Sequence, residues 1–104
     1  MSDSFAHLDA TAQADLVRRG EATPLELVDA AIARVERLNP QLNAVIHERF
    51  ERARAEATGD LPDGPFRGVP IVVKDLDGSV AGEPCHLGNR LLKDLGHVAD
   101  HDTY

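Results

Sequence analysis

The sequence predicts an α/β fold in which a set of helices precedes one buried strand. Apolar residues recur at helical spacing in the first sixty positions. The run from Val69 to Val73 is apolar throughout apart from Pro70, which is typical of a strand buried on both faces. Between these regions, residues 59–68 concentrate Gly, Pro and Asp and indicate a loop. A chain of 104 residues is enough for one small domain or for a piece of a larger one.

The first two helices are marked by their end signals. Residues 9–19 predict a short helix that Asp9 or Thr11 can cap, and Gly20 suits the left-handed position after it. The second helix is expected to begin at the segment Thr23-Pro24-Leu25-Glu26, which combines an N-cap threonine, a proline at the first helical position and the glutamate of a capping box. We expect it to end before Asn39-Pro40, because proline disfavours helical geometry in the residue before it.

The remaining elements follow from shorter patterns. Residues 42–46 are apolar and predict a short strand, and residues 47–57 predict a third helix that ends near Gly59. The segment Val69 to Leu76 is the clearest strand in the chain. Residues 77–90 return to turn-forming composition, and residues 91–95 indicate a short helical turn. Asp100 or Asp102 is expected to cap a further helix.

Composition and charge exclude several classes of partner. The formal charge is −7, and it is spread evenly: residues 1–52 carry 6 basic and 9 acidic side chains, and residues 53–104 carry 5 and 9. No basic patch emerges, although nucleic acids and anionic membranes both require concentrated Lys and Arg. The sequence therefore predicts no nucleic-acid partner and no membrane partner.

The N-terminal ten residues and the cysteine content bear on location. The segment MSDSFAHLDA has no apolar core of a signal peptide, and no part of the chain approaches the ~20 apolar residues of a membrane span. We therefore expect a cytoplasmic protein. The single cysteine, Cys85, excludes an internal disulfide and supplies too few thiolates for a zinc finger.

Lys74 is the first candidate for chemistry. Nine of the eleven basic residues are Arg, so the two lysines, Lys74 and Lys93, stand out. Arginine cannot be deprotonated in a protein, whereas burial lowers the pKa of a lysine from about 10.4 by up to ~3–5 units, so that it can act as a base. Lys74 lies at the carboxyl end of the predicted strand, where α/β proteins bind ligands. The alternative is a lysine that reaches solvent or pairs with an acidic side chain.

The segment around Lys74 resembles the lysine-bearing segment of the amidase signature family. The similarity lies in GVPIVVKDL (residues 68–76), then in Ala81-Gly82-Glu83-Pro84 and Gly88-Asn89, and extends upstream through LVRRGEATPLELVDAAIARVERLNPQLNAVI and downstream to ADHDTY. It covers roughly residues 8–104. The resemblance implies that residues 1–104 are the incomplete N-terminal part of an amidase domain, with helices and the lysine-bearing strand of a mixed sheet. Through DATAQADLVRRGE and ADHDTY, the chain is similar to a branch that acts on cyclic amide oligomers of the 6-aminohexanoate type.

The resemblance implies a serine amide hydrolase with a Ser-cisSer-Lys triad. In such a triad the lysine takes a proton from a serine in a cis peptide, and that serine activates a nucleophilic serine; backbone N–H groups stabilise the oxyanion. Only the lysine carries over, to Lys74. The serines of this chain are Ser2, Ser4 and Ser79, and none lies in a Gly/Ser-rich segment. We therefore read Ser79 as a turn residue and expect this chain alone to be inactive.

The partners that this implies are a small-molecule amide substrate and the missing C-terminal part of the amidase. No cofactor and no metal are implied, and a homo-oligomer is left open. The competing function is a non-catalytic helical interaction module, or a subunit piece whose apolar faces dock on a partner protein.

Other residue patterns give weaker alternatives. Cys85 and His86 are adjacent, so in extended chain they point to opposite faces and cannot readily form a thiol and base pair. A pairing of Lys74 with Cys85 and a carboxylate, as in nitrilase-like amide hydrolases, has no support in the surrounding sequence. Cys85 is better read as a small buried apolar residue.

A third functional class is a metal-binding domain. His97 and His101 are four residues apart with Asp100 and Asp102 nearby, a spacing that can bind a divalent metal on a helix. Gly96 and the predicted cap at residues 100–102 interrupt such a helix, which favours a solvated loop end instead.

Overall fold

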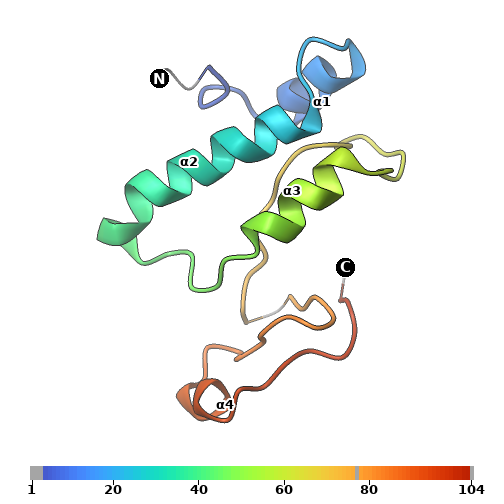
Figure 1. The fold of residues 1–104 in the computed structure, drawn as a ribbon. Helices are drawn as coiled ribbons and strands as arrows, with labels where there is room; N and C mark the ends of the chain where they lie inside the picture. Colours follow the sequence, from blue (N-terminus) through green and yellow to red (C-terminus); the bar gives the residue numbers. More distant parts are fainter. Residues whose placement is uncertain (1–3, 77, 104) are drawn as a thin grey trace. The chain divides into compact units, whose positions relative to one another are not determined.

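Four helices joined by loops make up the chain in the computed structural model, which describes residues 4–76 and 78–103. The chain divides into two compact units, Met1–Pro70 and Ile71–Tyr104. The first contains α1 (Ala10–Arg18), α2 (Pro24–Leu42) and α3 (Phe50–Thr58), and the second contains α4 (Arg90–Asp94) (Figure 1).

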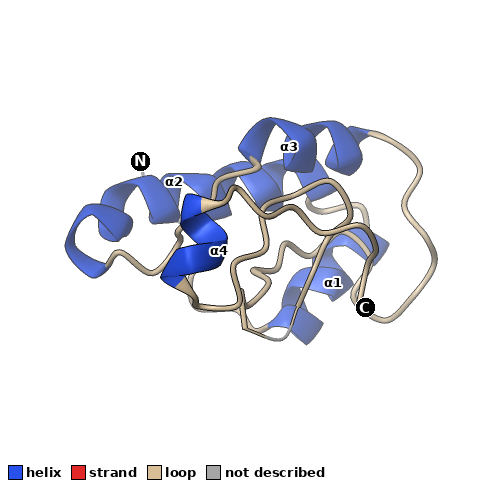
Figure 2. Cartoon of the chain, turned by 90° about the horizontal axis from the view of Figure 1, so that it is seen from below, coloured by secondary structure: helices blue, strands red, loops and turns tan. Residues whose placement is uncertain are grey.

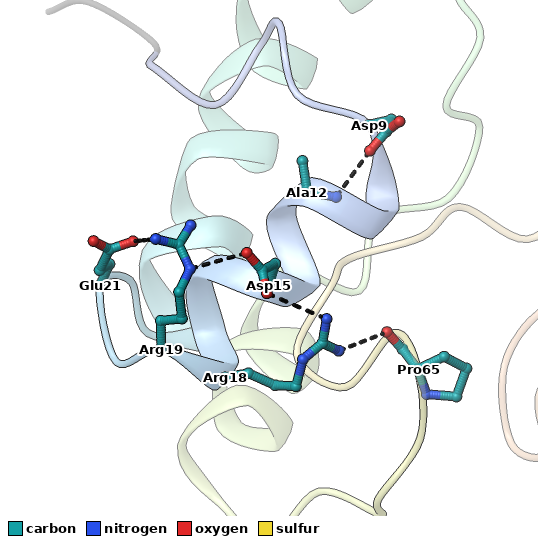
Figure 3. A network of polar contacts seen from close by, with 7 residues as sticks. All are labelled: Asp9, Ala12, Asp15, Arg18, Arg19, Glu21 and Pro65. Atoms are coloured by element: carbon teal, nitrogen blue, oxygen red, sulfur yellow. Dashed lines mark hydrogen bonds and ion pairs between the residues drawn. The ribbon is translucent and has the colours of Figure 1, made fainter.

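The start of α1 and the turn after it agree with the prediction for residues 9–19. The carboxylate of the N-cap residue Asp9 accepts a hydrogen bond from the amide of Ala12 at 2.8 Å. Gly20 has a φ of 73°, in the left-handed region that glycine adopts without steric cost. The last turn of α1 also carries an ion network in which Arg19 binds Asp15 at 2.9 Å (Figure 3).

The loop after α3 is attached to α1 and α2. The guanidinium of Arg18 donates to the carbonyl of Pro65 at 3.4 Å (Figure 3). Gly68 has a φ of +89°, and a Cβ there would lie 2.9 Å from Cγ of Pro24 and 3.4 Å from Val17. The absence of a side chain at residue 68 therefore lets the loop lie directly on the two helices.

The capping box at the start of α2 is present as predicted. The Thr23 hydroxyl accepts a hydrogen bond from the amide of Glu26 at 3.1 Å, and the Glu26 carboxylate accepts one from the amide of Thr23 at 3.2 Å. Two backbone donors at the helix start are thereby satisfied reciprocally. Pro24 occupies the first helical position, where its missing N–H leaves no bond unmade.

The predicted end of α2 before Asn39-Pro40 is wrong, because the helix runs on to Leu42 with Pro40 inside its last turn. The Asn39 side chain accounts for this: its oxygen accepts the amides of Ala44 and Val45, both at 2.8 Å, and its nitrogen donates to the Val45 carbonyl at 2.8 Å. Asn43 then ends the helix in the left-handed conformation, with a φ of 49°. These bonds offset the unfavourable backbone before proline. Of the strand predicted for residues 42–46, Leu42 belongs to α2 and residues 43–46 form coil.

The core of the first unit lies mainly along α2. Its buried apolar residues are Ala14, Ala22, Leu27, Val28 and Ile32. Leu27, with 1% exposure, is the largest side chain that is fully buried. Helix α3 begins at Phe50, three residues later than predicted, and lies alongside α2, where Arg54 pairs with Asp29 at 2.9 Å (Figure 1).

The second unit is held together by two chain segments that run antiparallel. The amide of Gly82 donates to the Ala99 carbonyl at 2.8 Å, and the amide of Ala99 donates to the Glu83 carbonyl at 2.9 Å. An isolated β-bridge joins Pro84 and Val98. Between the two segments, the Asn89 side chain caps α4 by accepting the amide of Leu91 at 2.8 Å. Among the side chains that this arrangement buries are Cys85, Ala99 and Glu83.

The strand predicted for Val69–Leu76 is not formed, and residues 4–76 and 78–103 contain no strand (Figure 2). Ile71, Val72 and Val73 are instead 70%, 79% and 41% exposed. A strand is stable only when a neighbouring strand accepts its backbone hydrogen bonds, and no segment of the described chain does so for this one. The helical part of the predicted α/β fold is therefore present, whereas the mixed sheet is not.

No helix in the described part of the chain is long and apolar enough to cross a membrane.

Candidate functional site

Lys74 lies in an extended segment of the second unit, and it is exposed. We expected its apolar neighbours to bury it, but Val72 and Val73 are themselves exposed in this chain. Among the residues that the structure describes, none forms an ion pair or hydrogen bond with the Lys74 ammonium group. The Lys74 amine is therefore exposed and has no acidic partner among the described residues.

Lys74 is exposed as a side chain but held through its backbone. The amide of Gly78 donates to the Lys74 carbonyl at 2.9 Å, which closes a turn directly after the lysine. A Cβ on Gly78 would lie 2.2 Å from Cγ1 of Val73, well inside van der Waals contact. Glycine at position 78 therefore allows the chain to fold back tightly against the lysine-bearing segment.

Asp75 binds a second loop of the same unit. One oxygen of its carboxylate accepts the amide of His86 at 2.8 Å, and the other accepts the amide of Gly88 at 3.0 Å. Partial burial would by itself raise the pKa of the Asp75 carboxyl, but the amides of His86, Gly88 and Leu87 and the nearby His86 ring outweigh it, so the pKa lies below its usual value. Asp75 is therefore a carboxylate held in its charged form.

Ser79 joins the two antiparallel segments of the unit. Its hydroxyl donates to the His101 carbonyl at 2.8 Å, and its amide donates to the hydroxyl of Thr103 at 2.8 Å. Asp102, which we expected as a possible helix cap, accepts the amide of Ala81 at 2.9 Å. The Ser79 hydroxyl thus makes a structural hydrogen bond, although Ser79 itself lies in coil and not in the turn that we expected.

The two histidines of the metal alternative make separate contacts. The ring of His97 donates to the Cys85 carbonyl at 2.7 Å, while the ring of His101 contacts the carboxylate of Asp100. The hydrogen bond from His101 lowers the pKa of the Asp100 carboxyl. Within residues 4–76 and 78–103, no three His, Cys, Asp or Glu side chains come close enough together to hold a metal ion.

Cys85 is buried, with 6% exposure. This agrees with the reading of Cys85 as a small apolar residue. His86 binds the Asp75 carboxylate through its backbone amide. The imidazole ring of His86 is therefore not the group that makes this hydrogen bond.

The role of Asp75 was not foreseen from the sequence. The sequence placed it next to Lys74 without naming a partner for it. The local signal was Gly88, because glycine adopts a positive φ at little cost and is common in turns. The particular partner of the loop could not be read from that pattern.

Comparisons with known proteins give the affiliation of the chain. The family model described as Amidase matches residues 26–103. A 6-aminohexanoate-cyclic-dimer hydrolase of Pseudomonas sp. (strain NK87) is 48% identical over 92% of this chain and 19% of its own length. A lipoamidase of Enterococcus faecalis is 45% identical over 78% of this chain and 11% of its own length.

The solved structures agree with this result. A structure of 6-aminohexanoate cyclic dimer hydrolase superposes on the chain with a TM-score of 0.81 at 48% identity, covering 90% of this chain and 19% of that one. The chain thus spans about a fifth of the length of these hydrolases, while the family match extends over most of its own length and includes Lys74. The chain therefore belongs to the amidase family.

Proposed function

We propose that the chain is the N-terminal part of a serine amide hydrolase, in which Lys74 is the base of a Ser-cisSer-Lys triad. The observation that carries this proposal is the 48% identity to 6-aminohexanoate-cyclic-dimer hydrolase over 96 residues, together with a family match from residue 26 to residue 103. The matched range includes the whole lysine-bearing segment, GVPIVVKDL.

In the proposed mechanism the neutral amine of Lys74 takes a proton from a serine in a cis peptide. That serine in turn accepts the proton of the nucleophilic serine, whose oxygen attacks the amide carbonyl, and backbone N–H groups stabilise the oxyanion. As the tetrahedral intermediate collapses, the proton held by Lys74 passes through the cis serine to the leaving nitrogen, and the amine is released. Water, deprotonated by the same groups, then attacks the acyl-enzyme and releases the carboxylic acid and the free serine. The two serines would lie in the part of the enzyme beyond this chain.

The exposed apolar residues around Lys74 support an incomplete domain. Val72 and Ile71 are more than two-thirds exposed, and Leu76 is 53% exposed. In the complete enzyme, we expect a neighbouring strand and its helices to cover this segment and so form the lysine-bearing strand of a mixed sheet. Such covering would remove Lys74 from solvent and bring it next to the serines.

The proposed substrate class is a small-molecule carboxylic amide. The similarity to 6-aminohexanoate-cyclic-dimer hydrolase makes a cyclic amide oligomer of that type the first compound to test. A lipoamidase, which is named for a different amide substrate, is also 45% identical to this chain over 82 residues. Identity of this degree is therefore compatible with more than one amide substrate. The complete protein should therefore be assayed with a linear amide as well.

The test of the proposed role is substitution of Lys74 in the complete protein. Lys74→Ala and Lys74→Arg should both lower kcat for amide hydrolysis by at least about 10²- to 10⁴-fold, the usual contribution of a general base. Arginine keeps the positive charge but cannot give up its proton. The Lys74→Arg variant therefore distinguishes the loss of a general base from the loss of a positive charge.

The matched control is Lys93→Ala, which removes the other lysine of the chain from the exposed side of α4. Its kcat should equal that of the unsubstituted protein. Near-normal turnover by Lys74→Ala would contradict the proposed base, and it would favour the alternative of a non-catalytic module that docks on a partner through its exposed apolar residues.

A further inference from the structure

The turn that binds Asp75 has an unusual backbone. Leu87 and Gly88 are consecutive residues with positive φ, at 52° and 66°. A leucine rarely adopts this region, because its Cβ approaches the neighbouring carbonyl, and such residues persist only where surrounding contacts determine the conformation. Leu87 and Gly88 form a turn, and the successive backbone N–H groups of a turn can point toward a common acceptor and form an anion-binding concavity.

The anion in this concavity is the carboxylate of Asp75. It accepts the amides of His86 at 2.8 Å and Gly88 at 3.0 Å, one on each oxygen. These bonds span 11 and 13 residues of sequence, so they tie the lysine-bearing segment to a distant loop of the same unit. Asp75 is a carboxylate at neutral pH, so both bonds are charge-assisted, and its lowered pKa preserves them in more acidic solution.

Two contacts hold the backbone at Lys74 and at the residue after it. The Lys74 carbonyl accepts the amide of Gly78 at 2.9 Å, and the carboxylate of the next residue, Asp75, is bound to the amides of His86 and Gly88. The lysine side chain itself is exposed and makes no ion pair with Asp75. Asp75 thus acts on the lysine through the main chain.

We infer that Asp75 is a positioning residue for Lys74: by binding the turn at residues 86–88, its carboxylate fixes the backbone from which the catalytic amine projects. This inference rests on the proposed role of Lys74 as the base. A displacement of a reacting group by about 1 Å can lower a rate by about 10²-fold, so the orientation of this segment matters for turnover.

The kinetic test uses Asp75→Asn and Asp75→Glu in the complete protein. Asparagine retains one acceptor oxygen but presents an NH₂ group to the second amide, so one of the two bonds is lost. Asp75→Asn should lower kcat by about 10- to 100-fold while KM changes by less than about twofold, because the inferred role of Asp75 is to orient Lys74 and not to bind substrate. Asp75→Glu, which keeps both oxygens, should recover part of the lost kcat.

Two controls separate positioning from a general loss of structure. Asp94→Asn removes an exposed carboxylate at the end of α4 and should leave kcat unchanged. In a Lys74→Ala background, Asp75→Asn should change the residual turnover by less than about twofold, because residues that act as a unit are not additive. A loss of kcat that only follows the loss of folded protein would overturn the inference, as would a normal kcat in Asp75→Asn.

A measurement on the chain itself does not depend on catalysis. In an NMR titration, the amide resonances of His86 and Gly88 should shift together with a midpoint below 3.8, the ordinary pKa of Asp. Since the folded pKa is lowered, the stabilisation by Asp75 is fully present above pH 3.8 and is lost as the pH falls through the folded value. The shared step should disappear in Asp75→Asn.

If the two amides do not titrate together in the unsubstituted chain, the geometry of the inference is wrong. If they do titrate but Lys74→Ala retains normal turnover, the proposed base fails instead. If Lys74→Ala is inactive and Asp75→Asn is fully active, only the positioning role fails.

Discussion

Gly20 and Gly68 both have a positive φ but differ in their surroundings. Both have positive φ, at +73° and +89°. A Cβ on Gly20 would meet no atom within 4 Å, whereas a Cβ on Gly68 would lie 2.9 Å from Cγ of Pro24. An alanine at Gly20 would meet only the cost of a left-handed backbone, whereas an alanine at Gly68 would also meet the cost of a close contact.

We predict that Gly68→Ala destabilises the first unit more than Gly20→Ala. The shared backbone cost is about 1–2 kcal/mol for a residue with a Cβ. Displacing Pro24 adds about 1–3 kcal/mol, the usual cost of overpacking. Urea denaturation followed by circular dichroism measures both free energies of unfolding. Equal values for the two variants would show that the contact between Gly68 and Pro24 does not constrain the loop.

Single polar side chains also order the turns of both units. Asn39 makes three hydrogen bonds with the main chain of residues 44 and 45, and Asp75 makes two with residues 86 and 88. In each case a short side chain satisfies backbone groups that have no partner in regular secondary structure. Irregular segments of this chain are thus ordered by single residues.

At the scale of the element, α2 is determined most strongly at its two ends. Its start has a complete capping box between Thr23 and Glu26, and its last turn contains Pro40 and is closed by Asn39 and Asn43. Between these ends, Leu27, Val28 and Ile32 supply most of the core of the first unit. The helix is therefore the main support of that unit.

We predict that Thr23→Ala destabilises the first unit by about 1 kcal/mol, because the amide of Glu26 loses its side-chain acceptor. Thermal denaturation followed by circular dichroism at a helix-sensitive wavelength provides the measurement. Thr23→Ser keeps the hydroxyl and should remain close to the unsubstituted chain. If alanine and serine gave the same midpoint, the capping box would contribute nothing to stability.

At the scale of the whole molecule, the chain spans 19% of the length of the 6-aminohexanoate-cyclic-dimer hydrolase that it matches. The segment around Lys74 exposes several apolar residues, with Val72 at 79% and Ile71 at 70%. Exposed neighbouring apolar side chains are typical of a surface that another part of the protein covers. Lys74 can act as proposed only once such a part brings the serines to it.

We predict that the 104-residue chain alone gives no detectable amide turnover, because the proposed nucleophile is not part of it. Adding a separately produced C-terminal part of the same amidase should restore turnover, and Lys74→Ala in the added chain should prevent this. Hydrolysis of the 6-aminohexanoate cyclic dimer, followed by release of amine, is the assay. Turnover by the chain alone would contradict the proposed division of the triad.

The sequence by itself determined the starts of the first two helices, the turn at Gly20 and the family. Caps join residues three positions apart, as in Asp9 with Ala12 and Thr23 with Glu26, so the local sequence contains both partners. The family follows in the same way from the contiguous segment around Lys74. Interactions between residues this close in sequence cost little loop-closure entropy, so a local pattern is enough to predict them.

Only the tertiary structure decided the features that depend on distant partners. The contact of Asp75 with residues 86 and 88 closes loops of 11 and 13 residues, and no local pattern names the partner. The strand predicted for Val69–Leu76 has the right composition, but its stability depends on a neighbouring strand that the described residues do not provide. Composition predicts that a segment can form a β-strand. Whether the strand forms depends on a second strand beside it that completes its backbone hydrogen bonds.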